Sequence, residues 1–142
     1  MEKNRMVILA TGIMKDSEGR ILLLKRSANN SSFIKDWQLP EGKVEFGEDP
    51  IDALEREIKE ETNCILTSNL RLFDVKSAIA SVNGMSIQII RIGYEVTGWK
   101  GKIEISEDHD EFKWLNINDA LKINLVVGVK DIINSYKEIK KK

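Results

Sequence analysis

The segment 41–63 reads EGKVEFGEDPIDALEREIKEETN, and its charge pattern is the most informative feature of the chain. Its only basic residues are Lys43, Arg56 and Lys59. Its acidic residues are Glu41, Glu45, Glu48, Asp49, Asp52, Glu55, Glu57, Glu60 and Glu61. Like charges three or four positions apart on a helix repel, at a cost of about 0.2–0.5 kcal/mol per pair. A helix in this segment therefore needs an interaction that compensates for its carboxylates.

The second half of the segment is predicted to be a helix that begins at Asp49 and Pro50 and ends at Asn63. Asp49 is a good N-cap, and Pro50 suits the first turn, where its missing N–H costs nothing. Asn63 can adopt the left-handed conformation that often ends a helix. One apolar stripe, spaced i, i+3 and i+7, is formed by Ile51, Leu54 and Ile58.

The carboxylates of this helix gather beside its apolar stripe. At about 100° per residue, Glu57, Glu60 and Glu61 share one sector, and Glu61 lies about 20° from Leu54. Glu61 is therefore expected at the edge of the buried face, where an uncompensated carboxylate is costly. A divalent cation such as Mg²⁺, which is held by a few carboxylates and by substrate phosphates, would relieve the cost. The alternative is a solvated acidic face, the usual explanation of a charge run.

The loop ahead of the helix favours the metal interpretation. Gly42 and Gly47 bracket a short segment with turn-forming character, and Glu48 follows it directly. A loop that contains glycine can bring a backbone carbonyl close to the carboxylates of the helix that it enters. Carbonyl and carboxylate oxygens are both ligands of hard cations.

The rest of the chain alternates strand and helix patterns. Runs rich in Val, Ile and Leu predict strands at 6–14 and 20–26. A long hairpin is predicted from strands at 70–82 and 85–97, because Asn83-Gly84 is the strongest short hairpin-turn signal. The region 98–101 is expected to interrupt the sheet, and 107–111 is expected to be an acidic loop. The remaining predicted elements are short strands at 103–105 and 112–115 and helices at 118–122 and 125–139.

This order predicts a mixed α/β fold in which helices cover a sheet. We find no internal repeat and no linker, and 142 residues suit one domain, so residues 1–142 are expected to form a single domain. The net charge of −1 gives no support for binding a nucleic-acid polymer. Cys64 is the only cysteine, which agrees with a cytoplasmic protein, and the run 6–14 is too short to span a membrane. No membrane partner is expected.

The segment 42–64 resembles the signature of the Nudix hydrolases, G-x5-E-x7-R-E-U-x-E-E-x-G-U, where U is a bulky apolar residue. Gly42 is followed after five residues by Glu48, and seven further residues lead to Arg56-Glu57. The following Glu60-Glu61 completes the charged positions of the signature, all of which agree.

Three positions depart from the family pattern. Asn63 replaces the final glycine of the signature, and Cys64 replaces its final apolar residue. Asn can take the same backbone conformation, and Cys is commonly buried. Glu41 stands where relatives usually have glycine in a W-x-L-P-G-G lead-in. None of these changes removes an implied ligand.

The resemblance to Nudix hydrolases implies an α/β/α sandwich with a mixed sheet, and hydrolysis of nucleoside diphosphates linked to another group. It implies Mg²⁺ or Mn²⁺ as the cofactor. It also implies that Glu48 and Arg56 form a salt bridge that positions the loop against the helix. The implied metal ligands are Gly42, through its carbonyl, and Glu57, Glu60 and Glu61.

The general base is not assigned by this resemblance, because families differ in where it sits. Glu57 or Glu61 can serve from the helix. Glu111 is a candidate from the acidic loop, and its alternative is a solvated surface residue. His109, the only histidine, is expected to be a surface residue without a catalytic role.

Three residues are candidates for substrate binding. Lys25 and Arg26 end a predicted strand and can meet phosphates, although charges at strand ends are often only solvated. Trp37 can stack on a base, as can Phe33 or Trp99, and each of these aromatic residues has core packing as its alternative.

The expected function is metal-dependent hydrolysis of a pyrophosphate bond. The expected substrate is a nucleoside triphosphate, with damaged nucleotides included as for MutT-like relatives. The alternatives are a non-catalytic nucleotide sensor on the same fold and an ADP-sugar or dinucleotide pyrophosphatase. Relatives specific for ADP-ribose carry a proline beyond the signature, whereas this chain has only Pro40 and Pro50. A small-molecule nucleotide is the expected partner, and the protein is expected to be a monomer or homodimer.

Overall fold

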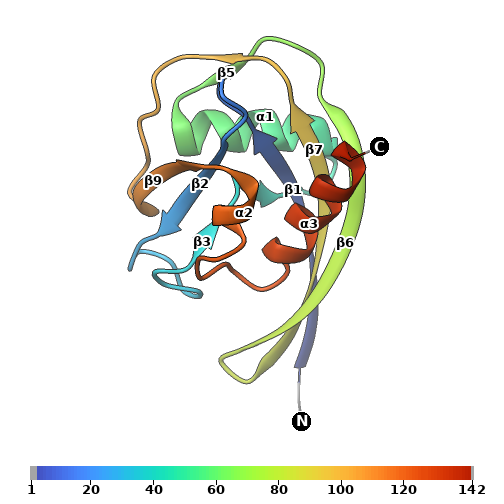
Figure 1. Cartoon of the computed structure of the whole chain (residues 1–142). Helices are drawn as coiled ribbons and strands as arrows, with labels where there is room; N and C mark the ends of the chain where they lie inside the picture. The colour runs from blue at the N-terminus through green and yellow to red at the C-terminus, as the bar shows by residue number, and fades with distance from the viewer. Residues whose placement is uncertain (1–2, 142) are drawn as a thin grey trace.

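The computed structural model describes residues 3–141, which form a mixed α/β fold (Figure 1). The larger sheet has the strand order β4-β1-β7-β6. Strands β1 and β7 run parallel, whereas β4 and β6 each pair antiparallel to their neighbours. The strands of this sheet are β1 (Lys3–Met14), β4 (Glu41–Lys43), β6 (Arg71–Val82) and β7 (Met85–Val96).

A second, antiparallel sheet lies beside the first and has the order β3-β2-β9. Its strands are β2 (Ile21–Arg26), β3 (Trp37–Gln38) and β9 (His109–Leu115). A small antiparallel pair joins β5 (Ile65–Leu66) to β8 (Trp99–Lys100).

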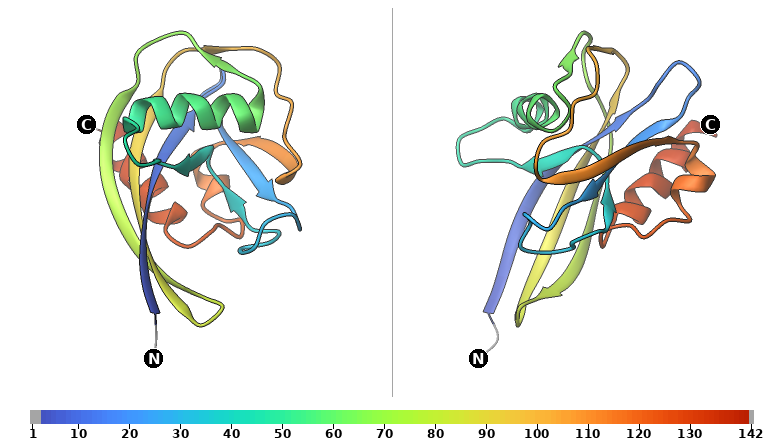
Figure 2. Two further views of the ribbon diagram at one scale, coloured as in Figure 1. Left: turned by 180° about the vertical axis from the view of Figure 1, so that it is seen from behind. Right: turned by 90° about the vertical axis from the view of Figure 1, so that its left-hand side faces the viewer.

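Helices lie on both sides of these sheets. Helix α1 (Pro50–Thr62) covers one side, and α2 (Ile117–Ala120) and α3 (Val129–Lys140) lie on the other, as the edge-on view of Figure 2 shows. The predicted α/β/α sandwich with a mixed sheet is therefore confirmed. Among residues 3–141, no helix is long and apolar enough to cross a membrane.

The helix that carries the carboxylates forms as its local signals predict. The Asp49 side chain accepts a hydrogen bond from the Ile51 N–H at 2.9 Å, and Asn63 ends the helix with a φ of 64°. Leu54 and Ile58 are fully buried, together with Ala53. Ile51, predicted to share this stripe, is 39% exposed, because it lies in the first turn at the end of the helix.

The predicted hairpin is also present. Its turn is Asn83-Gly84, with φ values of 50° and 75°, and the two strands end and begin directly beside it. Positive φ at both turn residues matches the right-handed twist of the flanking strands. The hairpin and the first part of β1 extend beyond the body of the fold (Figure 1).

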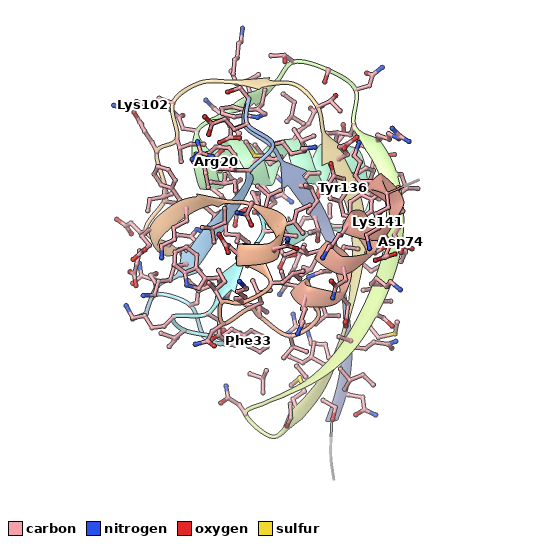
Figure 3. All side chains as sticks on the ribbon, viewed as in Figure 1. Arg20, Phe33, Asp74, Lys102, Tyr136 and Lys141 are labelled. Atoms are coloured by element: carbon pink, nitrogen blue, oxygen red, sulfur yellow. The ribbon has the colours of Figure 1, made fainter. Side chains whose placement is uncertain are left out.

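Two hydrophobic clusters hold the layers together. One joins α1 to the sheets, and the other joins α3 to them; Figure 3 labels Asp74 of β6 and Tyr136 of α3 in the second region. Strand β2 contributes to both clusters because successive side chains point to opposite faces. Leu22 and Leu24 face the α1 cluster, whereas Ile21 and Leu23 face the α3 cluster.

Two features of the region after β7 differ from prediction. The segment 98–101 ends the four-stranded sheet as predicted, but Trp99–Lys100 also forms an unpredicted strand, β8, in a separate pair with β5. Trp99 is held there by stacking on Trp114, with ring centroids 5.5 Å apart, and by donating its indole N–H to the Lys15 carbonyl at 2.8 Å. Residues 103–105 form no strand, and Ile103 and Ile105 instead pack against the core as irregular chain.

Three element boundaries in the last third also differ from prediction. Strand β9 begins at His109, inside the predicted acidic loop, because its pairing with β2 continues past a bulge to Arg26. Helix α2 ends at Ala120, two residues short of the prediction. Helix α3 begins at Val129 rather than at 125, because Gly128 has a φ of 88° and Val126 donates its N–H to the Trp37 carbonyl.

The left-handed end of α1 gives a test of the fold. We expect Asn63→Gly to change the free energy of unfolding by less than about 1 kcal/mol, since glycine adopts this conformation freely. Asn63→Val should destabilise the protein by about 1–2 kcal/mol, the cost of left-handed backbone for a residue with a branched side chain. Urea unfolding measures both, and a valine variant as stable as the native protein would contradict the assigned cap.

Candidate metal and substrate site

Arg56 joins the loop before α1 to the helix itself. Its Nε and Nη2 each donate to one carboxylate oxygen of Glu48 at 3.0 Å, and Nη2 also donates to the Lys43 carbonyl at 3.1 Å. The planar guanidinium matches the carboxylate in this two-point contact. This contact lowers the pKa of Glu48 to about 2. The structure therefore contains the ion pair that the Nudix resemblance implied.

Glu57 lies between this ion pair and the backbone of β4. Its Oε1 accepts a hydrogen bond from Arg56 Nη1 at 2.6 Å. Burial nevertheless raises the pKa of the Glu57 carboxyl. A Cβ atom added to Gly42 would stand 2.0 Å from Glu57 Cδ, so only glycine allows the two to approach this closely. Two of the predicted ligands are thus in contact.

Glu60 and Glu61 have different surroundings. The Glu60 side chain is 58% exposed, and its Oε2 lies 3.7 Å from Arg56 Nη1. Glu61 is buried, as its position on the helical wheel predicted, and its Oε1 accepts the Glu41 backbone N–H at 3.0 Å. Burial, and then the charge of Glu57, raise the pKa of Glu61 well above its ordinary value.

These residues supply the oxygen ligands that a hard divalent cation prefers, but their side chains do not converge on one point. Among residues 3–141, no three His, Cys, Asp or Glu side chains are grouped as a metal site. The Arg56 guanidinium instead lies against Glu57 and Glu60, where it supplies the positive charge. The pKa values of buried Glu61 and half-buried Glu57 are both raised, and with the backbone of β4 these carboxyls form an oxygen-rich set that a cation would stabilise.

A pocket of about 320 Å³ is lined by Glu41 and Lys43 of β4, and the α1 carboxylates are not part of its lining. Apolar side chains, including Ile89 and Val126, share its lining with Arg26 and Glu41. Phe33 also lines it, from the loop between β2 and β3 (Figure 3). An apolar surface with a few charged groups is typical of pockets that bind small molecules.

Glu41 connects this pocket to the helix. Its carboxylate Oε1 accepts from Thr11 Oγ1 at 2.8 Å and from Arg91 Nε at 2.9 Å, while its backbone N–H is bonded to Glu61. Arg91 is 1% exposed and also donates from Nη1 to the Val127 carbonyl at 2.7 Å. The sequence analysis missed this role of Arg91. The departure of Glu41 from the family glycine was the one available signal.

The three predicted substrate residues separate in the structure. Arg26 lines the pocket, where its guanidinium donates to Gln38 Oε1 at 2.6 Å. Trp37 is instead buried in the α3 cluster, and the Lys25 ammonium lies 6.0 Å from the centre of its ring. Neither Lys25 nor Trp37 lines the pocket.

Glu111 is placed away from the other predicted catalytic residues. It is exposed on β9 directly opposite Lys25, and its carboxylate lies 4.0 Å from the Lys113 ammonium. Residues that pair across strands share one face of a sheet, so Glu111 faces the side on which Lys25 meets Trp37. The side chains of α1 pack on the other side, through Leu22 and Leu24.

The expectation that His109 is a surface residue is wrong. Its side chain is 2% exposed, and its Nε2 lies 3.8 Å from Glu61 Oε2. Burial lowers the pKa of His109 to about 4. The bulge between β2 and β9 places His109 opposite Arg26, and the acidic neighbours that suggested a solvated loop gave no sign of this.

Fold and site together define a mixed-sheet α/β/α protein in which β4 connects an acidic helix to a pocket. Residues 7–136 match the family profile described as the NUDIX domain. The chain therefore belongs to the Nudix family and is a Nudix-type enzyme. The sequence resemblance that was carried by the segment 42–64 is confirmed over nearly the whole chain.

The curated relatives differ in name. The chain is 28% identical to an octanoyltransferase of Myxococcus xanthus over 131 residues, which are 91% of the chain but 35% of that protein. It is 28% identical to an RNA pyrophosphohydrolase of Pelagibacter ubique, with 92% of the chain and 86% of that protein covered. An ADP-ribose pyrophosphatase of Methanocaldococcus jannaschii is 33% identical, over 76% of the chain and 61% of that protein. The chain thus spans only part of two of these relatives.

Solved structures agree on the fold. A MutT protein from Methanosarcina mazei has a TM-score of 0.86 and 23% identity, and 100% of this chain and 99% of that chain are covered. A MutT NUDIX hydrolase from Burkholderia pseudomallei has a TM-score of 0.78 and 26% identity, with 92% and 97% covered. The layered arrangement of Figure 1 is therefore the Nudix fold.

The contact between Gly42 and Glu57 gives a test of the site. We expect Gly42→Ala to change the free energy of unfolding by less than about 1 kcal/mol, since the contacted group ends a flexible side chain. The added methyl group must displace the Glu57 carboxylate, so Mn²⁺ affinity in calorimetry should fall by about tenfold or more.

Gly47→Ala is the matched control for this test. Gly47 has a φ of 81°, and a Cβ atom there would meet nothing within 4 Å. Its replacement should cost about 1 kcal/mol of stability through backbone strain and leave Mn²⁺ affinity unchanged. Equal loss of metal affinity in both variants would contradict a specific role for the Gly42–Glu57 contact.

The raised pKa of Glu61 predicts how the metal-free protein responds to pH. A carboxyl whose pKa is higher in the folded state holds its proton more tightly there than when unfolded. Stability should therefore fall as the pH rises from the ordinary value of 4.5 toward the raised value. Each unit of difference corresponds to about 1.4 kcal/mol.

Glu61→Gln removes this titrating group and should give a flatter dependence of stability on pH. Chemical denaturation at about pH 5 and pH 8, in the presence of a chelator, measures the slope for both proteins. Glu55→Gln, an exposed change on the same helix, serves as the control. Parallel slopes for native protein and Glu61→Gln would show that Glu61 is not the group responsible.

Proposed function

We propose that the protein hydrolyses a pyrophosphate bond in a nucleoside triphosphate, with Mg²⁺ or Mn²⁺ as its cofactor. The observation that carries this proposal is the contact of two α1 carboxylates with the backbone of β4: half-buried Glu57 meets Gly42, and buried Glu61 accepts the Glu41 N–H. The side chain of Glu41 in turn lines a pocket of about 320 Å³. A purely solvated acidic face would leave these groups exposed with ordinary pKa values, and it would not require Gly42 to be in contact with Glu57.

In this proposal Glu57, Glu60, Glu61 and the Gly42 carbonyl hold the cation. A bound divalent cation supplies acidification of water and neutralisation of phosphate charge. Forming the site requires Glu57 and Glu60 to turn away from Arg56, which stays anchored through Glu48 and the Lys43 carbonyl. Arg56 is then a positioning residue that keeps the loop against the helix.

The chain's own groups also supply the other functions of the site. Glu57 or Glu61 is the proposed general base, because both carboxylates lie on α1 within the set of groups that would hold the cation. Arg26 is placed to meet the negative charge of the substrate from the pocket wall. Phe33 can stack on the base from the opposite loop. Glu111 is less favoured as a base, since its ion pair is with Lys113.

The substrate is proposed to be a nucleoside triphosphate because the chain lacks the proline beyond the signature that relatives specific for ADP-ribose carry. The pocket of about 320 Å³ is within the size range of pockets that bind small molecules. Relatives named RNA pyrophosphohydrolase and ADP-ribose pyrophosphatase provide the competing substrates. We further propose that residues 1–142 act as one cytoplasmic domain.

A substrate screen with purified protein and Mg²⁺ or Mn²⁺ tests the proposal. We expect a nucleoside triphosphate, followed by release of phosphate or pyrophosphate, to be hydrolysed faster than 5′-triphosphorylated RNA, followed in the same way. It should also be hydrolysed faster than ADP-ribose, which is followed by formation of AMP and ribose 5-phosphate. Pyrophosphate as the product would assign the attack to the bond between the α and β phosphates. Glu57→Gln and Glu60→Gln should each lower kcat by about tenfold to a hundredfold, since each removes a charged ligand.

Glu55→Gln is the matched control for both variants, because it removes a carboxylate from the exposed side of the same helix. Its kcat should equal that of the native protein. Native protein that binds nucleotides but cleaves none of them would instead support a sensor function. Unchanged turnover in Glu60→Gln would reject the metal assignment.

A further inference from the structure

His109 is a buried polar residue whose hydrogen bonds are not accounted for. Its side chain is 2% exposed, and neither Nδ1 nor Nε2 has a hydrogen-bond partner among residues 3–141. Buried polar groups in folded proteins almost always have partners, because an unpaired one costs about 1–3 kcal/mol. A histidine kept in such a position therefore has a partner in some working state of the protein.

Glu61 is the group closest to supplying that partner. A neutral imidazole carries one N–H, and Nε2 of His109 lies 3.8 Å from a carboxylate oxygen, Glu61 Oε2. A hydrogen bond needs about 2.7–3.2 Å, so a shift of roughly 1 Å or less closes the gap.

The other oxygen of Glu61 is already held. Oε1 accepts the Glu41 backbone N–H at 3.0 Å, and the Glu41 side chain is fixed by Arg91 and Thr11. All of these groups are buried, so the donor on this side has little freedom to move. A second donor at Oε2 would fix the plane of the carboxylate from both sides.

We propose that His109 is a positioning residue that donates its Nε2–H to Glu61 Oε2 and, with the Glu41 N–H, orients this carboxylate toward the bound divalent cation. The inference rests on the proposed function, because it assigns Glu61 to the cation. A carboxylate oxygen can bind a cation through one lone pair and accept a hydrogen bond through another. Such hydrogen bonds to a metal ligand fix its geometry. Removing one commonly lowers metal affinity by about 10–100-fold.

Two substitutions separate this role from simple packing. His109→Leu keeps an apolar side chain of similar size and removes the donor, whereas His109→Gln keeps a side-chain N–H. In calorimetry with Mn²⁺ alone, the full chain carrying His109→Leu should bind about 10–100-fold more weakly than native protein. His109→Gln should recover most of the lost affinity.

Metal-free stability gives the second readout. His109→Leu removes an unpaired buried polar group, so its melting temperature in chelator should equal or exceed that of native protein. A residue that only packs the core would show the opposite pattern, with lower stability and no rescue of Mn²⁺ affinity by glutamine. If the leucine variant does not fold, His109→Phe takes its place as the apolar variant.

The outcomes distinguish this inference from the proposed function beneath it. Native protein that binds no Mn²⁺ would overturn the metal site itself. If His109→Leu binds Mn²⁺ as tightly as native protein does, only the proposed role of His109 is overturned. Binding by His109→Gln as weak as that of His109→Leu would also overturn it, because the donor would then be irrelevant. Weaker Mn²⁺ binding by His109→Leu, together with recovered binding by His109→Gln, supports the proposed role of His109.

Discussion

The arrangement of the site depends on the Arg56 guanidinium, which donates hydrogen bonds to several acceptors at once. Arg56 donates to Glu48, to the Lys43 carbonyl and to Glu57, so a single side chain joins the loop to the helix and neutralises part of the acidic cluster. Without it, carboxylates on both sides of the loop would repel one another. The planar, two-point contact with Glu48 explains why arginine rather than lysine suits this position.

A second constraint comes from β4, which has different neighbours on its two sides. Gly42 faces Glu57 so closely that an added Cβ atom must displace the Glu57 side chain, and the side chain of Glu41 turns the other way to Thr11 and Arg91. The Glu41 backbone N–H reaches Glu61. Three residues of strand thus hold the carboxylates of the helix at a fixed place relative to the pocket, so in the proposed function one short element positions both substrate and cation.

Much of the fold followed from local signals, and the errors share one cause. The caps of α1 and the Asn83-Gly84 turn were predictable because each depends on a few neighbouring residues. Burial of Glu61 was predictable from helical periodicity alone. In contrast, β8 is stabilised by stacking of Trp99 on Trp114, which is distant in sequence. Patterns among neighbouring residues do not predict such a contact.

The sequence by itself determined the helix, the acidic cluster and the Nudix family, because the spacing of charges along one helix is a local property of the chain. Only the tertiary structure decided which charged residues meet. It brought Arg26 to the pocket, left Lys25 beside Trp37, and buried His109 against Glu61. The physical reason is that strand register and a single bulge select the face on which each side chain lies, and both are set by packing between distant segments.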